Sequence, residues 1–111
     1  MSLIQEIRVV QGDTRPNLEF TVLVDGIAQD LTDTTVRFKI RKFGETTNIN
    51  DAANTCTITD ATNGICEYPW RSGDLADAGD YEGELEITFG DDTVQTQFPK
   101  YLIKVRAQLY E

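Results

Sequence analysis

The sequence contains no histidine, only two cysteines and no long apolar run. Histidine is the commonest general base and metal ligand in proteins, so its absence removes the residue on which most acid–base and zinc sites depend. Two cysteines alone cannot build a structural zinc site, which takes four ligands. No apolar stretch approaches the roughly 20 residues that span a bilayer, and the N-terminus lacks the layout of a secretory signal. We therefore expect a soluble protein that is not inserted in a membrane and not exported by that route.

The whole chain has a net charge of −9, and basic residues are scarce in its middle. Residues 1–42 are balanced, with six basic and six acidic residues, and residues 100–111 carry a net charge of +2. Residues 43–99 hold twelve acidic residues and one base, Arg71. Because an acidic surface repels phosphate backbones, nucleic acid is not an expected partner.

Apolar residues recur at every second position along most of the chain, which predicts strands. In residues 18–25 and 34–42 the alternation is clearest, and Asp25-Gly26 at the end of the first of these is typical of a hairpin turn. Further strands are expected in residues 4–10, 55–60, 65–70, 81–89, 93–98 and 101–109. Pro69 cannot donate to a sheet, so the strand at 65–70 should be an edge strand or end there.

The segments between these strands are short or polar. Residues 42–55 should form a loop, with a short strand near Ile49 as an alternative, and one helical turn is expected near Asp74–Asp77. No segment has a sustained helical period. Seven to nine short strands in 111 residues predict an all-β fold, a single antiparallel β-sandwich domain covering residues 1–111.

The segment Asp77-Ala78-Gly79-Asp80-Tyr81 resembles the tyrosine corner of immunoglobulin-like sandwiches. There a tyrosine near the start of strand F packs in the core, and its hydroxyl bonds to the backbone a few residues upstream. In antibody domains a cysteine follows two residues later, but here Gly83 takes that position, so the inter-sheet disulfide is absent. Trp70 precedes the corner and is not the strand-C tryptophan of antibodies. We expect it to pack in the core.

This assignment makes residues 34–42 strand C and residues 81–89 strand F, which are antiparallel neighbours. The outward residues of the two strands carry opposite charge: Arg37, Lys39 and Arg41 on one, Glu82, Glu84 and Glu86 on the other. Each such cross-strand pair contributes roughly 0.2–1 kcal/mol. Catalytic carboxylates need a cleft and shifted pKa values, which an open charge ladder does not provide. We therefore predict structural roles for these six residues and no catalytic residue.

Three other groups of residues, namely aspartates, cysteines and aromatic residues, have both a structural and a functional interpretation. Calcium, which takes six to eight oxygen ligands, is one alternative for Asp74, Asp77, Asp80, Asp91 and Asp92. Aspartates in turns more often bond the local backbone, so no metal and no cofactor are predicted. Cys56 and Cys66 could form a disulfide across their hairpin, but buried reduced thiols are favoured without an export signal. Exposed aromatic residues could bind carbohydrate, and the candidates are Tyr68, Trp70 and Tyr101.

Five motifs, in this order, resemble the N-terminal domain of the upper baseplate protein of tailed bacteriophages. They are "QGDTRPNLEFTVLVDG" (11–26), "DLTDTTVRFKIR" (30–41), "NGICEYPW" (63–70), "GDLADAGDYEGELEITFGDD" (73–92) and "QFP" (97–99). The resemblance implies an immunoglobulin-like fold and a non-enzymatic structural role in a phage or prophage tail, within machinery that attaches the particle to its host. It implies location in the virion, preceded by the cytoplasm of the bacterial host during assembly.

The resemblance also implies other virion proteins as partners, and it leaves a homo-oligomer open. Asp33-Thr34 departs from the Gly-Ala pair that often follows "DLT" in the family. Family members commonly continue into further modules, whereas this sequence ends at Glu111. A head or neck decoration protein, or a carbohydrate-binding accessory module, is therefore the alternative. The terminal segments "LIQEIRVV" and "YLIKVRAQLYE" are less acidic than the middle, and we expect them, with nearby loops, to contact partner subunits.

Overall fold

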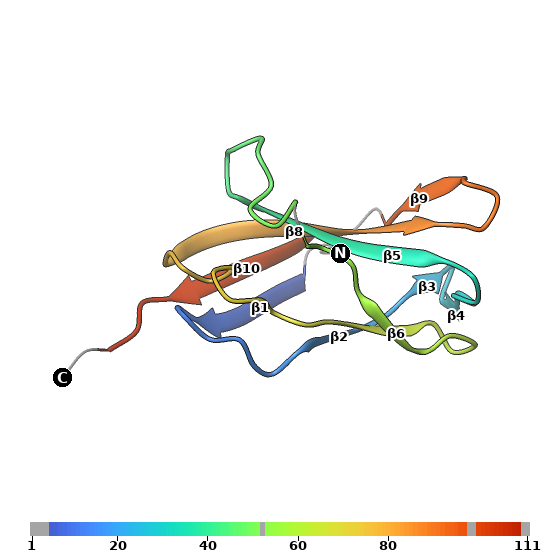
Figure 1. The fold of residues 1–111 in the computed structure, drawn as a ribbon, viewed down its shortest axis with the longest axis horizontal. Helices are drawn as coiled ribbons and strands as arrows, with labels where there is room; N and C mark the ends of the chain where they lie inside the picture. Colours follow the sequence, from blue (N-terminus) through green and yellow to red (C-terminus); the bar gives the residue numbers. More distant parts are fainter. Residues whose placement is uncertain (1–4, 52, 98–99, 110–111) are drawn as a thin grey trace.

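The computed structural model describes residues 5–51, 53–97 and 100–109, which form ten short strands (Figure 1). Over these residues the fold is all-β, without a helix. Accordingly, nothing described is a helix long and apolar enough to cross a membrane. The strands are β1 (Gln5–Val10), β2 (Leu18–Thr21), β3 (Leu23–Val24), β4 (Ile27–Ala28), β5 (Thr35–Lys42), β6 (Thr57–Asp60), β7 (Ile65–Tyr68), β8 (Gly79–Thr88), β9 (Val94–Thr96) and β10 (Tyr101–Arg106).

The strands build two layers and a small hairpin. The larger sheet has the order β1-β10-β8-β5, with β9 also paired to β8, and the smaller sheet has the order β2-β7-β6. These correspond to the G-F-C and B-E-D sheets of an immunoglobulin-like sandwich, with β1 beside the last strand. All pairs are antiparallel except β1 with β10. The predicted sandwich is therefore confirmed, with β5 and β8 as neighbours.

One predicted strand is divided into β2 and β3, and the short strand β4 was not predicted, which together raise the number above the expected seven to nine. Between β2 and β3 the chain exchanges its partner strand, because the N–H of Val22 donates to Gly64 while its carbonyl accepts from Gln29. Strands β9 and β10, which were predicted as separate, pair with different parts of β8: β9 with residues 86–88 and β10 with residues 79–83. The hairpin predicted at Asp25-Gly26 is present, with φ angles of 53° and 79° as in a type I′ turn.

The core between the sheets centres on aromatic rings. Phe38 of β5 is fully buried and lies 4.8 Å from the ring centroid of Phe20, 5.5 Å from that of Tyr68 and 5.7 Å from that of Tyr101. Most of these pairs are tilted or edge-to-face, an arrangement worth roughly 0.5–1.5 kcal/mol beyond the area buried. Because Phe20 and Tyr68 belong to the smaller sheet, Phe38 joins the two layers.

Gly83 of β8 provides the space for this ring. A Cβ atom at Gly83 would lie 2.5 Å from Cζ of Phe38, well inside van der Waals contact. The Phe38 ring of the neighbouring strand β5 therefore fills the space that the cysteine side chain would occupy at this position in antibodies. Close packing of Phe38 on the backbone of β8 takes the place of the inter-sheet disulfide.

The strand at residues 65–70 is central in its sheet and ends at Tyr68, directly before Pro69, which confirms the second of the two alternatives predicted for it. Two other local expectations concern the loops. Near Ile49 there is a single bridge between Asn48 and Arg41 and no strand. Residues 72–75 form a hydrogen-bonded turn and not a helical one. Phe98 and Pro99 of the "QFP" motif, and residues 3–4 and 110–111 of the terminal segments, lie outside the described residues.

We expect Gly83→Ala to lower the free energy of unfolding by about 1–3 kcal/mol, because the added methyl group overpacks against the Phe38 ring. Urea unfolding of the single variant measures this cost. In a Phe38→Leu background the same alanine should cost less, since the smaller side chain leaves room for it. Equal costs in the two backgrounds would contradict the proposed contact.

Candidate functional site

The outer face of β5 and β8 carries the two charged rows predicted from the sequence. In the antiparallel register Arg37 lies opposite Glu86, Lys39 opposite Glu84 and Arg41 opposite Glu82. The same strands direct Val36, Phe38 and Ile40, together with Tyr81, Leu85 and Ile87, into the core. A strict two-residue period on both strands therefore separates the apolar face from the charged face.

The ion pairs follow this register only in part. Nε and Nη2 of Arg41 both lie 2.5 Å from the same carboxylate oxygen of Glu82. Lys39, however, reaches diagonally to Glu86, with a Nζ–O distance of 2.8 Å, instead of bonding the opposite Glu84. Among the described residues, Arg37 and Glu84 take part in no ion pair within 4 Å. A long lysine side chain can span the diagonal of a sheet, which the register alone does not determine.

The basic side chains are less exposed than the sequence suggested. Arg37, Lys39 and Arg41 are all half-buried, because the loop after β5 returns along this strand. Two bridges, Arg41 with Asn48 and Arg37 with Thr55, hold that loop in place. The expectation of a fully open ladder was wrong, since alternation identifies the outer face but not a loop that covers it.

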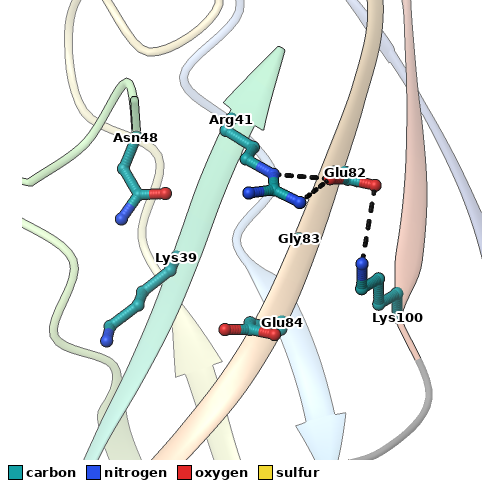
Figure 2. A pocket seen from close by; sticks show the side chains of 7 residues that line it. All are labelled: Lys39, Arg41, Asn48, Glu82, Gly83, Glu84 and Lys100. Carbon is teal, nitrogen blue, oxygen red and sulfur yellow. Dashed lines mark hydrogen bonds and ion pairs between the residues drawn. The ribbon is translucent and has the colours of Figure 1, made fainter. Parts of the chain in front are cut away.

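A small depression lies on this face, between β5, β8 and the start of β10 (Figure 2). It has a volume of about 80 Å³, enough for a few water molecules. Glu82 lies between Arg41 and Lys100, with 3.9 Å from its carboxylate to the Lys100 ammonium group. Glu82 is therefore paired with cations on two sides, and this small charged depression suits a polar protein contact better than a substrate pocket.

The tyrosine corner has the geometry expected of it. Tyr81 is buried, and its hydroxyl donates to the backbone carbonyl of Asp77 at 2.7 Å. Burial is the main cause that raises the pKa of Tyr81. Gly79 has φ of 139°, a conformation that side chains disfavour. The carboxylate of Asp77 points elsewhere and pairs with Lys42 at 3.2 Å, which raises the pKa of Lys42.

A buried polar network, which the sequence did not predict, fixes two loops to the core. The hydroxyl of Tyr68 donates to Asp74 at 2.6 Å and accepts from the amide of Asn50 at 3.1 Å. Burial, followed by the bond to Asp74, raises the pKa of Tyr68. Asn50 also bonds the backbone of β5 at Phe38 and Ile40, as an additional strand would. Asn50 and Asp74 lie in loops without hydrophobic periodicity, so no sequence pattern could have indicated that they are buried.

The aromatic candidates for carbohydrate binding are mostly inaccessible. Tyr68 is fully buried and Trp70 is 5% exposed, and the two rings pack edge-on at 5.3 Å. The indole N–H of Trp70 finds no hydrogen-bond partner in the part of the chain that the structure describes. Tyr101 is half-buried and packs on Phe20 at 5.1 Å. The three rings belong to the core and its margin, and they form no exposed platform.

The aspartates and cysteines also have local roles. Asp74 is buried in the network, while Asp91 accepts bonds from the backbone and hydroxyl of Thr93, which lowers the pKa of Asp91. Within residues 5–51, 53–97 and 100–109, no group of three or more Cys, Asp or Glu residues could hold a metal ion. Cys56 and Cys66 are free and buried, and the hydrogen bond that the Cys56 thiol donates to Cys66 raises the pKa of Cys56.

These features define an immunoglobulin-like sandwich that has a tyrosine corner and a charged sheet face but no inter-sheet disulfide. A family model, the BppU N-terminal domain, matches residues 2–107, and the chain belongs to this family of phage baseplate proteins. Among solved structures the murine protein CRIg is similar, with 12% identity and a TM-score of 0.41 over 95% of this chain and 93% of that one. No curated protein matches the chain at a level that indicates a relative.

We expect the Arg41–Glu82 pair to couple by about 0.5–1 kcal/mol in a double-mutant cycle of alanine substitutions, and less in high salt. The reason is that both guanidinium nitrogens contact one half-buried carboxylate. Denaturant unfolding of the four proteins gives the coupling energy. The Arg37–Glu86 cycle is the matched control, since these residues are opposite in register without an ion pair. Equal coupling in both cycles would show that charge alone, and not contact, is responsible.

We expect Tyr81→Phe to reduce the free energy of unfolding by about 1 kcal/mol, because the bond between the hydroxyl of the buried Tyr81 and the carbonyl of Asp77 is lost. Asp77→Ala should cost less, since it removes only an exposed ion pair and leaves that carbonyl bonded. Chemical unfolding of both variants tests this order. A larger loss for Asp77→Ala would show that the corner depends on the carboxylate instead.

Proposed function

We propose that this chain is a non-enzymatic structural subunit of a phage tail, most directly of the baseplate, and that it contacts other virion proteins through β1 and β10 with their adjoining loops. Membership of the BppU N-terminal domain family, over nearly the whole chain, is the observation that carries this proposal. The domain would fold in the cytoplasm of the bacterial host, where particles assemble, and then take part in the machinery that meets the host.

The geometry of the charged depression supports a role in protein binding better than a role in catalysis. The charged depression on the outer face of β5 and β8 has a volume of about 80 Å³, and its carboxylate Glu82 is paired with Arg41 and Lys100. No nucleophile–histidine arrangement is available in a sequence without histidine. We therefore assign structural roles to the charged rows of β5 and β8, to the tyrosine corner and to Trp70.

Strands β1 and β10 are suited to contact because they form one edge of the larger sheet. Strand β1 has a single partner strand, β10, so its other edge is unpaired within the described fold. Unpaired edges and exposed outer faces are the places where sandwich domains acquire neighbours. The charge of the ends also differs from that of the middle, since residues 43–99 have a net charge of −11.

Cross-linking of purified particles, read out by mass spectrometry, tests the proposal. Lys104 on β10 should link to other virion proteins more efficiently than Lys39, which lies on β5 in an ion pair with Glu86. Residues 43–99 contain no lysine, so a second linker that joins carboxylates must report on that segment. Absence of the chain from particles would refute the virion role, and links confined to residues 43–99 would refute the contact surface.

A further inference from the structure

Three basic side chains gather at the β1 edge of the larger sheet, although the chain as a whole is acidic. Arg8 lies directly opposite Lys104 in the parallel pairing of β1 with β10, and Arg106 follows opposite Val10. All three basic residues are exposed. They surround a depression of about 310 Å³ to which Val9 and Val10 contribute apolar surface. We call this depression the basic groove.

The positive charge of the basic groove is only partly neutralised by its own chain. Arg8 bonds Glu6, its neighbour on the same strand. Asp80 also lines the groove and lies opposite Lys104 on the adjacent strand. Neither Lys104 nor Arg106 makes an ion pair within 4 Å to any residue that the structure describes. The groove therefore retains a positive surplus beside an apolar floor, which favours a partner with carboxylates and a small apolar side chain.

A surface of that description occurs at the other end of the same molecule. The β3–β4 turn, the β4–β5 loop and the β8–β9 turn lie together at the end opposite the final residues of β1 and β10 (Figure 1). The β8–β9 turn approaches the β4–β5 loop closely, since a Cβ on Gly90 would lie 3.6 Å from the carbonyl of Asp33. The three segments carry exposed aspartates and no basic residue. We call them the acidic loop end, and its aspartates are Asp25, Asp30, Asp33, Asp91 and Asp92.

The acidic loop end also exposes apolar side chains. Ile27, at the β3–β4 turn, is 72% exposed, and Val94, directly after the β8–β9 turn, is 57% exposed. Exposed apolar side chains that are surrounded by polar residues are a common feature of protein interaction sites. The acidic loop end thus complements the basic groove in two respects. Its aspartates are opposite in charge to the basic residues of the groove, and its exposed Ile27 and Val94 match the apolar surface of Val9 and Val10.

We propose that a second copy of this chain docks its acidic loop end in the basic groove of the first, so that the copies associate head to tail. The two surfaces lie at opposite ends of a molecule 49 Å long, so one copy cannot satisfy both by itself. Such an interface is heterologous, because two different surfaces of the chain meet. Repeating the contact between successive copies produces a closed ring or an open filament, depending on the rotation that relates one copy to the next. The proposal goes beyond the virion role, because it holds or fails in the purified protein alone.

The net charge of −9 does not prevent this contact at physiological salt. Exposed charges are screened beyond a Debye length of about 8 Å at 0.15 M ionic strength, which is short compared with the molecule. Local complementarity then outweighs the repulsion between distant charges. A single groove and loop end bury less surface than a permanent interface, so the dissociation constant should lie in the range of about 10 μM to 1 mM.

Sedimentation velocity of the wild-type chain from about 10 μM to about 1 mM is the first measurement. The sedimentation coefficient should rise with concentration, and the rise should be smaller at about 0.5 M salt than at about 0.15 M. A coefficient independent of concentration, characteristic of a monomer, would overturn the proposal.

Charge variants then identify the surfaces. Lys104→Glu with Arg106→Glu reverses the basic groove. Asp25→Asn, Ile27→Lys, Asp92→Asn and Val94→Lys reduce the charge of the loop end from −5 to −1, and asparagine tolerates the positive φ of Asp25 and Asp92. Each variant alone should associate at least about tenfold more weakly than wild type. Mixed together they should associate again, because the native loop end of the groove variant meets the native groove of the loop-end variant.

The matched control is Glu19→Lys with Asp51→Lys, two exposed positions outside both surfaces. This control changes the net charge by the same +4 as the loop-end variant, and its association should stay within about twofold of wild type. Thermal unfolding of every variant establishes that it is folded. Association that survives both charge variants, or a mixture that associates no better than its components, would overturn the pairing of these surfaces. Neither result affects the particle cross-linking that tests the virion role.

Discussion

The contact between Phe38 and the backbone of Gly83 is the constraint on which the rest of this sandwich depends. It places a ring of β5 directly on β8, at the position where antibody domains attach their inter-sheet sulfur bridge. From Phe38 the aromatic contacts extend to Phe20 and Tyr68 in the opposite sheet. These contacts hold the two sheets together. Within the larger sheet β5 pairs with β8, so the outward residues of the two strands form adjoining rows.

The charged face is the outer consequence of the same packing. Once β5 and β8 pair with Phe38 over Gly83, the register brings Arg41 beside Glu82 on the outside. The tyrosine corner fixes where β8 begins, since the hydroxyl of Tyr81 bonds the loop before it. The core, the corner and the charged rows are therefore three consequences of one strand alignment, and disturbing the alignment would affect all three together.

The sequence predicted those parts of the molecule that depend on period and spacing. Alternation identified Phe38 as buried and Arg37 as outward, and the spacing of Gly79 and Tyr81 indicated the corner. It could not predict the loop that covers β5, because Asn48 and Asn50 lie in a polar segment without period. Nor could it predict that Lys39 bonds Glu86 instead of Glu84, since a flexible side chain chooses among several partners of equal charge. The basic groove was also hidden, because Arg8 and Lys104 are 96 positions apart and meet only through a parallel pairing.

The free, buried state of Cys56 and Cys66 has a practical consequence. A sandwich held together by rings instead of sulfur bridges needs no oxidising compartment to reach its final form. The segments of its acidic loop end belong to the B–C and F–G connections, which carry two of the three hypervariable loops in antibody variable domains. A scaffold with that combination can be diversified, expressed and selected inside living cells, where disulfide-dependent antibody domains commonly fail to fold.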